Sequence, residues 1–337
     1  MARAYLDWNA TTPLRNEARA AMMAAMDCLG NPSSVHNEGR AAKAIIERAR
    51  TQVSEATGAS GADIIFTSSA TEAAALALRG QNYASSAQEH DCVLAWTSHE
   101  PKPLHKTAKQ QVNSETGVIQ VVESGTGFSD AVQAIGKVPY SFSWSGVDRA
   151  IISAHKFGGP KGIGALIVKQ GIDVEAALKG GGQEMGRRSG TENVIGIAGM
   201  GAAAEAAQKD LETGVWQKVE QIRNVFEERL LNDAPDTIIF GADDARLPNT
   251  SYFAVPGWKG ETQVMQMDIA GFAVSAGSAC SSGKVRASKV LKALGYDDVT
   301  ASSAIRVSIG PSTTQQELES FAQAWLKEYR RFKARAA

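Results

Sequence analysis

The sequence predicts an α/β protein with a large domain first and a smaller α+β domain last. Apolar runs that read as strands alternate with amphipathic helical stretches along most of the chain. A long helical pattern over residues 199–231 suits a connector between two domains. The length of 337 residues is too great for one small core. We therefore expect a large domain over residues 14–212 and a small domain formed by residues 1–13 and 213–337.

Hydrophobic periodicity predicts the elements in order. Residues 15–27 and 38–57 have the spacing of amphipathic helices, and an Ala/Leu-rich helix follows at 73–78. Short apolar runs bounded by turn residues predict strands. In the large domain these runs lie at 63–67, 93–96, 118–122, 150–153 and 164–168. In the small domain we expect strands at 237–240, 250–255 and 272–275, and helices at 262–267, 288–294 and 314–334.

Composition excludes several classes of protein. The 35 basic and 36 acidic side chains nearly cancel, which argues against nucleic acid or an anionic membrane as the main partner. The N-terminus has no apolar segment typical of a secretory signal, and the longest apolar stretch, residues 194–204, is too short to span a bilayer. The three cysteines lack metal-site spacing, so we expect no metal and a reducing, cytoplasmic location.

A lysine is the first candidate for chemistry. Residues 151–156 end a predicted strand on Ser-Ala-His-Lys, and the glycine-rich turn 157–162 follows. The carboxyl edge of an open α/β sheet is where ligands bind, and partial burial there leaves Lys156 some free amine for a Schiff base. Spacing alone favours the other interpretation, a surface lysine in a turn.

Two further segments supply what pyridoxal 5'-phosphate (PLP) would need beside Lys156. Asp130 stands at a plausible strand end, with Gln133 three residues on, and an acidic partner keeps the pyridine ring protonated. Residues 68–71 begin a helix with hydroxyls and backbone N–H groups that suit a phosphate. Each segment also has a purely structural interpretation, because aspartate and threonine are common N-cap residues and Asp130 and Thr71 could each cap a helix.

A cysteine lies in a segment of small residues. Residues 274–283 read Val-Ser-Ala-Gly-Ser-Ala-Cys-Ser-Ser-Gly after a predicted strand. Such a segment can carry the Cys280 thiol to a reaction centre. The alternative is a small buried cysteine, which is our interpretation of Cys28 and Cys92.

With these pieces in order, the chain resembles the cysteine desulfurases of the class V aminotransferase family, which are NifS/IscS-like and have PLP-dependent transferase fold type I. The matching segments run nearly the whole length of the chain. They are residues 5–13, 30–36, 66–72, 130–133, 153–156, 188–193, 275–280 and 303–306.

The resemblance implies a large domain with a mostly parallel sheet flanked by helices, and a role for each matching residue. Lys156 would be the Schiff-base lysine, Cys280 the nucleophile, and His99 the histidine that stacks on the cofactor. The cofactor would be bound by Ala70, Thr71, Asp130, Gln133, Ser153, His155 and Lys156, with Thr191 contributed by the other subunit of a homodimer. The substrate L-cysteine would be bound by Asn9, Ala10 and Arg306. The products would be L-alanine and a Cys280 persulfide, which passes to a sulfur-acceptor protein such as an iron–sulfur scaffold.

The chain departs from the family on the cofactor side. The family has the stacking histidine in a Glu-His context after a strand, but residues 99–100 read His-Glu, so that His99 and Glu100 are both candidates for its place. Ser114 replaces a ring-side asparagine, and Ser69 replaces a glycine. Between residues 101 and 112 we expect only a short connection. These departures leave open a degenerate homologue that acts as a binding or scaffold protein, or another PLP-dependent lyase or aminotransferase.

Overall fold

The computed structural model describes residues 3–99, 106–123, 125–277 and 287–336. The chain divides into two compact units. The first unit comprises Met1–Thr11, Asn113–Ile119 and Gly214–Ala337, and the second comprises Thr12–Val112 and Gln120–Thr213. Within the described ranges, no helix is both long enough and apolar enough to cross a membrane.

The second unit is built on a six-stranded sheet in the order β2-β7-β6-β5-β4-β3. The strands are β2 (Ala62–Thr67), β3 (Tyr83–Ser85), β4 (Lys106–Gln110), β5 (Thr126–Asp130), β6 (Arg149–Ser153) and β7 (Gly164–Lys169). The pairs β3–β4, β4–β5 and β5–β6 are parallel, and β7 is antiparallel to both β2 and β6. This arrangement confirms the predicted α/β fold with a mostly parallel sheet.

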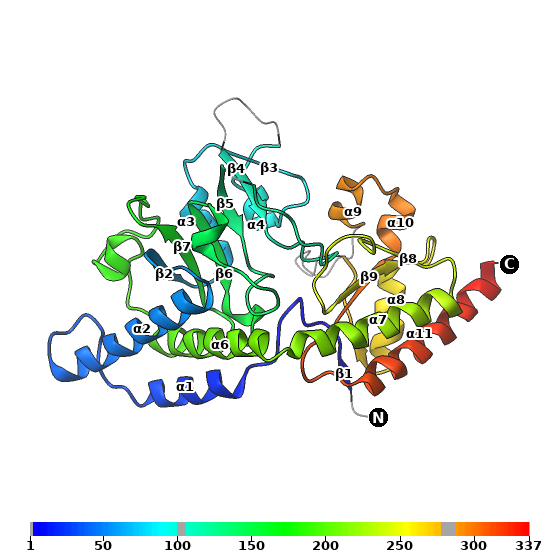
Figure 1. Cartoon of the computed structure of the whole chain (residues 1–337), viewed down its shortest axis with the longest axis horizontal. Helices are drawn as coiled ribbons and strands as arrows, with labels where there is room; N and C mark the ends of the chain where they lie inside the picture. The colour runs from blue at the N-terminus through cyan, green and yellow to red at the C-terminus, as the bar shows by residue number, and fades with distance from the viewer. Residues whose placement is uncertain (1–2, 100–105, 124, 278–286, 337) are drawn as a thin grey trace. The chain divides into compact units, whose positions relative to one another are not determined.

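Helices cover both faces of this sheet. The helices of this unit are α1 (Asn16–Met26), α2 (Asn37–Ala56), α3 (Ala70–Leu78), α4 (Asp91–Leu94), α5 (Phe142–Ser145) and α6 (Val194–Glu212). Figure 1 shows α1, α2 and α6 side by side, and they share one apolar cluster with β6. Side chains of β6 pack on both faces of the sheet. Ile152 belongs to this cluster, while Ile151 belongs to the cluster beneath α3 and α4. That alternation is the period of two expected of a strand buried on both sides.

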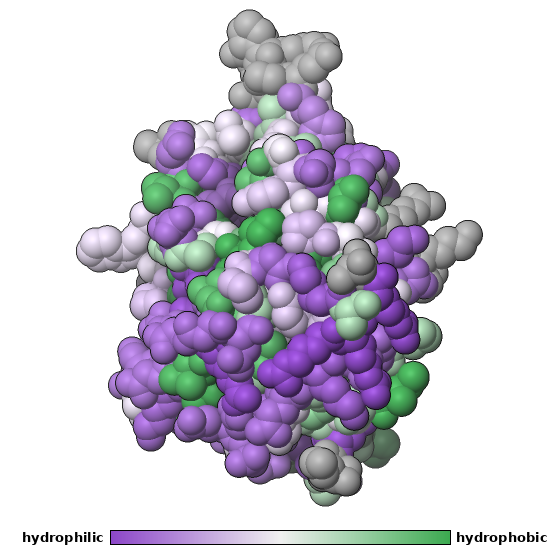
Figure 2. Space-filling model, turned by 90° about the vertical axis from the view of Figure 1, so that its right-hand side faces the viewer, coloured by the Kyte–Doolittle hydropathy of each residue, from purple (hydrophilic) through white to green (hydrophobic). Residues whose placement is uncertain are grey.

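The first unit contains a three-stranded antiparallel sheet, a two-stranded parallel sheet and five helices among its described residues. Its strands are β1 (Ala4–Tyr5), β8 (Ile238–Ile239), β9 (Thr250–Ala254), β10 (Phe272–Ala273) and β11 (Ala304–Ser308). Its helices are α7 (Val215–Asp233), α8 (Gly260–Ile269), α9 (Lys289–Ala293), α10 (Asp298–Ser303) and α11 (Gln315–Ala336). Trp325 of α11 packs edge-on against Phe253 of β9, with ring centroids 5.4 Å apart. Figure 2 shows one face of the molecule, on which hydrophilic side chains predominate and apolar ones form small groups.

Most predicted elements are present, and the exceptions have local causes. Residues 93–96 were predicted as a strand, which is wrong, because the His90 side chain caps α4 at Asp91–Leu94. The predicted strand at 118–122 is also wrong, since Val118 makes only an isolated bridge. The predicted long connector is two helices, α6 and α7, because Gly214 adopts a left-handed φ of 74° between them.

A further correction concerns residues 101–112, where we expected only a short connection. The strand β4 (Lys106–Gln110) forms there and pairs with both β3 and β5. The local pattern Lys-Thr-Ala-Lys-Gln is too polar to predict a strand.

Candidate active site

Two neighbouring strands of the second unit end on predicted site residues. β5 ends at Asp130 and β6 ends at Ser153. The strands are parallel, with Asp130 opposite Ile151, so both carboxyl ends lie at one edge of the sheet. The short 3₁₀ helix η1 (Ala154–Lys156) follows β6 directly and leaves Lys156 partly buried. The fold therefore brings together the aspartate and the lysine that the sequence predicts for PLP.

Asp130 is a buried carboxylate with charged neighbours. Its Oδ1 accepts the N–H of Val132 at 2.9 Å. Burial raises the pKa of Asp130, while His90, the bond from Val132 and Lys156 act in the opposite direction. A cation placed against a buried carboxylate favours its charged form. A protonated pyridine nitrogen is such a cation, so the environment of Asp130 fits its predicted partner.

His155 has a buried nitrogen that no described residue satisfies. Its Nδ1 is inaccessible to solvent and has no hydrogen-bond partner among the described residues. Burial, together with the charges of Lys156, Lys161 and Lys137, lowers the pKa of His155 to about 4. The imidazole is therefore neutral near pH 7. An orphaned nitrogen surrounded by three ammonium groups suits a bound anion, as predicted for the phosphate.

The start of α3 has the geometry expected of a phosphate site. Ser69 is the N-cap and accepts the N–H of Glu72 at 3.2 Å, while Glu72 accepts the N–H of Ser68 at 2.7 Å. The Glu72 carboxylate thus bonds the residue before the N-cap, and Ala70 and Thr71 lie in the first turn at the positive end of the helix. Ser69, which replaces a family glycine, is thus explained as the capping residue.

Gly164 of β7 lies against the backbone at the start of α3. A Cβ atom at this position would come within 2.6 Å of the Ser69 carbonyl carbon. Only glycine allows β7 to pass this close to the turn that begins α3. The close approach fixes the predicted phosphate-binding turn against the sheet.

Thr191 follows a loop that curls back over the same region. It lines a cavity of about 170 Å³ together with Thr67, Ser68 and Gly162 of its own chain. The loop is held by Ser189, whose hydroxyl donates to the Gly181 carbonyl at 2.7 Å. The predicted role of Thr191, which is to reach the cofactor of a second subunit, stays a prediction.

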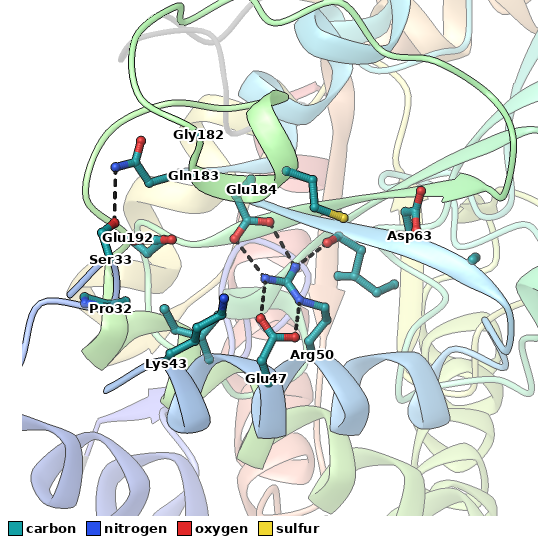
Figure 3. A pocket seen from close by; sticks show the side chains of 14 residues that line it. Pro32, Ser33, Lys43, Glu47, Arg50, Asp63, Gly182, Gln183, Glu184 and Glu192 are labelled. Atoms are coloured by element: carbon teal, nitrogen blue, oxygen red, sulfur yellow. Dashed lines mark hydrogen bonds and ion pairs between the residues drawn. The ribbon is translucent and has the colours of Figure 1, made fainter. Parts of the chain in front are cut away.

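A larger cavity of about 670 Å³ lies beside this loop (Figure 3). At its base the Arg50 guanidinium contacts both Glu184 oxygens, at 2.9 and 3.1 Å. Glu184 also accepts the N–H of Phe66 at 3.0 Å. Glu184 and Met185 have left-handed φ values of 49° and 59°. Glu184 therefore fastens a strained loop to helix α2 through Arg50 and to strand β2 through Phe66, and we interpret these contacts as structural support for the segment that leads to Thr191.

Two histidines, His99 and His90, are candidates for the predicted role of stacking on the cofactor ring, and their surroundings differ. His99 makes a long contact of 3.5 Å between its Nδ1 and the Ser85 carbonyl oxygen. His90 is the N-cap of α4, and its Nδ1 lies 3.2 Å from the Cys92 backbone nitrogen and 3.0 Å from the Cys92 sulfur. His90 also lies close enough to Asp130 to lower the pKa of that carboxylate.

The sequence contained a signal for His90 that the prediction missed. Glu89-His90 is a Glu-His pair shortly after β3, which is the family context for the stacking histidine. Glu89 is buried, its Oε1 accepts the N–H of Gln110 at 2.8 Å, and burial raises its pKa to about 8. The predicted strand over 93–96 obscured this pair, because it moved the expected strand end forward to His99.

In the first unit, Arg306 is nearly fully buried, with 3% of its surface exposed. Its two terminal nitrogens donate to the Ser114 carbonyl and to Asp7 Oδ1, each at 2.9 Å. Its Nε is buried and has no partner among the described residues. A buried N–H is expensive to leave unpaired, so this edge of the guanidinium suits a carboxylate ligand.

The other predicted substrate residues have different surroundings. Asn9 is buried and bonded to neighbours in its own unit, donating through Nδ2 to Thr250 at 2.8 Å and accepting from Asn249 at 3.1 Å. Ala10 is partly buried. Their predicted roles at the substrate stay predictions. The nucleophile Cys280 lies outside the described residues.

Comparison with known proteins gives a consistent result. The family model described as aminotransferase class-V matches residues 4–126 and 106–321. A cysteine desulfurase of Cereibacter sphaeroides is 37% identical, covering 95% of this chain and 94% of that protein.

Two solved structures are similar over nearly the whole chain. A NifS-like protein from Rickettsia africae superposes with a TM-score of 0.88 at 29% identity, covering 97% of this chain and 99% of that one. SspA in complex with cysteine superposes with a TM-score of 0.75 at 26% identity, covering 92% of this chain and 100% of that one.

Proposed function

We propose, from the premise that the chain belongs to the aminotransferase class-V family, that it is a cysteine desulfurase that uses PLP. One observation of the structure supports this most strongly: the ends of two adjacent parallel strands bring Asp130 and Lys156 to one sheet edge, beside the orphaned Nδ1 of His155. When bound, PLP supplies an electron sink for the negative charge that develops on the substrate carbon.

The residues present fit the cofactor. Lys156 holds the aldehyde carbon, Asp130 pairs with the ring nitrogen, and Gln133 bonds the ring oxygen. The phosphate is bound by Ala70, Thr71, Ser153 and His155, and by Thr191 from a second copy of the chain. The support is the positive N-terminal end of α3 and the cationic surroundings of His155, which both favour an anion.

His90, rather than His99, stacks on the cofactor ring and moves protons. The support is its electrostatic contact with Asp130 and its place in the Glu-His pair after β3. The altered segment around His99 was the main argument for a degenerate homologue, and with His90 in the role that argument no longer holds.

Arg306 binds the carboxylate of L-cysteine through its Nε and the adjacent N–H. Asp7 and the Ser114 carbonyl hold the guanidinium from its other edge. Bidentate binding of a planar carboxylate is the particular strength of arginine. The serine that replaces a family asparagine therefore contributes its backbone oxygen to the substrate arginine.

Sulfur leaves the substrate by attack of the Cys280 thiolate on the cysteine sulfur. The new S–S bond forms as the substrate C–S bond breaks, and the carbon takes up a proton to leave as L-alanine. The balance is one L-cysteine and one thiol giving one L-alanine and one persulfide, with no external oxidant. The persulfide then passes to a thiol of an acceptor protein, such as an iron–sulfur scaffold, by thiol exchange.

Alanine production tests this function. Purified protein with PLP, L-cysteine and a reducing thiol should form alanine, and the Cys280→Ala variant should form little. Borohydride reduction followed by mass spectrometry should place the cofactor on Lys156. No alanine and no Lys156 adduct from the wild type would refute the proposal.

A further inference from the structure

A buried lysine stands beside the predicted cofactor residues without a role in the reaction. Lys137 lies in the turn after β5 and has 2% of its surface exposed. Its Nζ donates to Gln133 Oε1 at 2.5 Å. Burying an ammonium group is costly, so a lysine in this position requires a specific reason.

The contact fixes which end of the Gln133 amide faces which way. An ammonium group has three N–H donors and no acceptor, so only the carbonyl end of a carboxamide can bond to it. The oxygen and nitrogen of a glutamine are assigned from such contacts. Gln133 is itself buried, so its NH₂ group must point away from Lys137.

The orientation of the Gln133 carboxamide determines how it can interact with the cofactor. Gln133 can stabilise an anionic ring oxygen only by donating an N–H, because its carbonyl would repel that oxygen. Lys137 bonds the carbonyl end of the Gln133 carboxamide, and this bond favours the orientation in which Gln133 acts as a donor.

We propose that Lys137 is a positioning residue that holds the Gln133 carboxamide with its NH₂ group towards the PLP ring oxygen. The inference rests on the proposed function, because it requires PLP beside Gln133. The positive charge of Lys137 also acts on His155, so it adds to the cationic surroundings of the phosphate.

The visible absorption of the bound cofactor changes with pH, and it can be measured without turnover. The pH midpoint of that change is lower the more strongly the protein stabilises the anionic ring oxygen. Lys137→Met should raise the midpoint by about one pH unit, a roughly tenfold change in the protonation equilibrium. Lys137→Gln keeps an N–H donor for the Gln133 carbonyl without the charge, and should stay closer to the wild type.

Other charged groups near the ring must be held constant. These groups are Asp130, His90, His155, Lys156 and Lys161. Lys161→Met is the matched control, because Lys161 is exposed and also acts on His155. It removes the same charge but leaves the bond between Lys137 and Gln133 in place, and should shift the midpoint less than Lys137→Met.

A double-mutant cycle separates orientation from charge. In a Gln133→Ala background the effect of Lys137→Met should fall to less than half, because no amide remains to orient. An equal shift in both backgrounds, or no shift in either, would overturn the proposal. If Lys137→Met does not fold, Gln133→Glu gives the second test. The new carboxylate pairs with Lys137 and has no N–H, so the midpoint must rise, and an unchanged midpoint overturns the proposal equally.

Failure of the proposed function and failure of the Lys137 inference give different results. Absence of a cofactor band and of a Lys156 adduct in the wild type would remove both the proposed function and this inference. A normal wild-type band with an unmoved Lys137→Met midpoint would remove the inference alone.

Discussion

Replacement of His90 tests the histidine assignment, provided that its two roles are kept apart. His90 caps α4 by accepting the N–H of Cys92, and we propose that its ring also moves protons. Asparagine is a strong N-cap, so His90→Asn removes the imidazole while keeping the cap. His90→Ala removes both, and should cost about 1 kcal/mol of stability in addition.

The expected magnitude follows from the role. Loss of a positioned general acid or base typically slows a reaction by about 10²–10⁴-fold. We therefore expect His90→Asn to form alanine at least about 100-fold more slowly while its thermal unfolding stays near that of the wild type. His99→Asn is the matched control, because the contact of His99 among the described residues is the long one of 3.5 Å with Ser85, and its rate should change by less than about threefold.

Alanine formation under saturating PLP and L-cysteine measures both variants. Circular dichroism and thermal melting show whether each variant is folded. A large loss in His99→Asn with an active His90→Asn would refute the assignment and restore the original prediction.

Three further predictions concern the supporting structure. Arg50→Met should lower the free energy of unfolding by about 3–5 kcal/mol, because the Glu184 side chain is 1% exposed and would be left charged and unpaired. Urea unfolding should show that Arg50→Met with Glu184→Met recovers part of this loss, and no recovery would contradict the reasoning. The pKa of Glu89 is raised from 4.5 to about 8, so the folded protein keeps a proton that the unfolded chain releases, and stability should fall as pH rises through that window. Glu89→Gln should flatten this slope, which is at most about 1.4 kcal/mol per pH unit, in melts recorded from pH 5 to 8. Arg306→Lys should raise the KM for L-cysteine roughly tenfold or more, since a lysine cannot bind the carboxylate bidentately, and an unchanged KM in steady-state kinetics would count against the carboxylate role.

Local pattern was sufficient for much of the fold. The helices α1, α2 and α11 and the strands β2, β6 and β7 have strong periodicity or compact apolar runs, and each lies within a few residues of its predicted bounds. β4 could not be predicted in the same way, because its residues are mostly polar and its strand conformation comes from pairing with β3 and β5.

The residues of the candidate site also differ in whether the sequence alone could identify them. Lys156 and Asp130 stand at strand ends, and a strand end can be predicted from sequence. Lys137 could not be identified this way, because its proposed role depends on a contact with Gln133. That contact is formed by the turn after β5 and cannot be predicted from the local sequence. The strand predicted at 93–96 is absent, and the Glu89-His90 pair after β3 is therefore the basis for proposing His90 in place of His99.

The two orphaned atoms connect stability with function. The buried Nδ1 of His155 and the buried Nε of Arg306 each lack a partner among the described residues. An unsatisfied buried polar group costs about 1–3 kcal/mol, so the folded chain carries this cost at both positions. A ligand that supplies the missing partner removes the cost and is bound more tightly for it. With its proton on Nδ1, the His155 imidazole needs a hydrogen-bond acceptor, as the Nε–H of Arg306 does. A phosphate and a carboxylate meet these needs, which is the pair of anions that PLP and an amino acid bring.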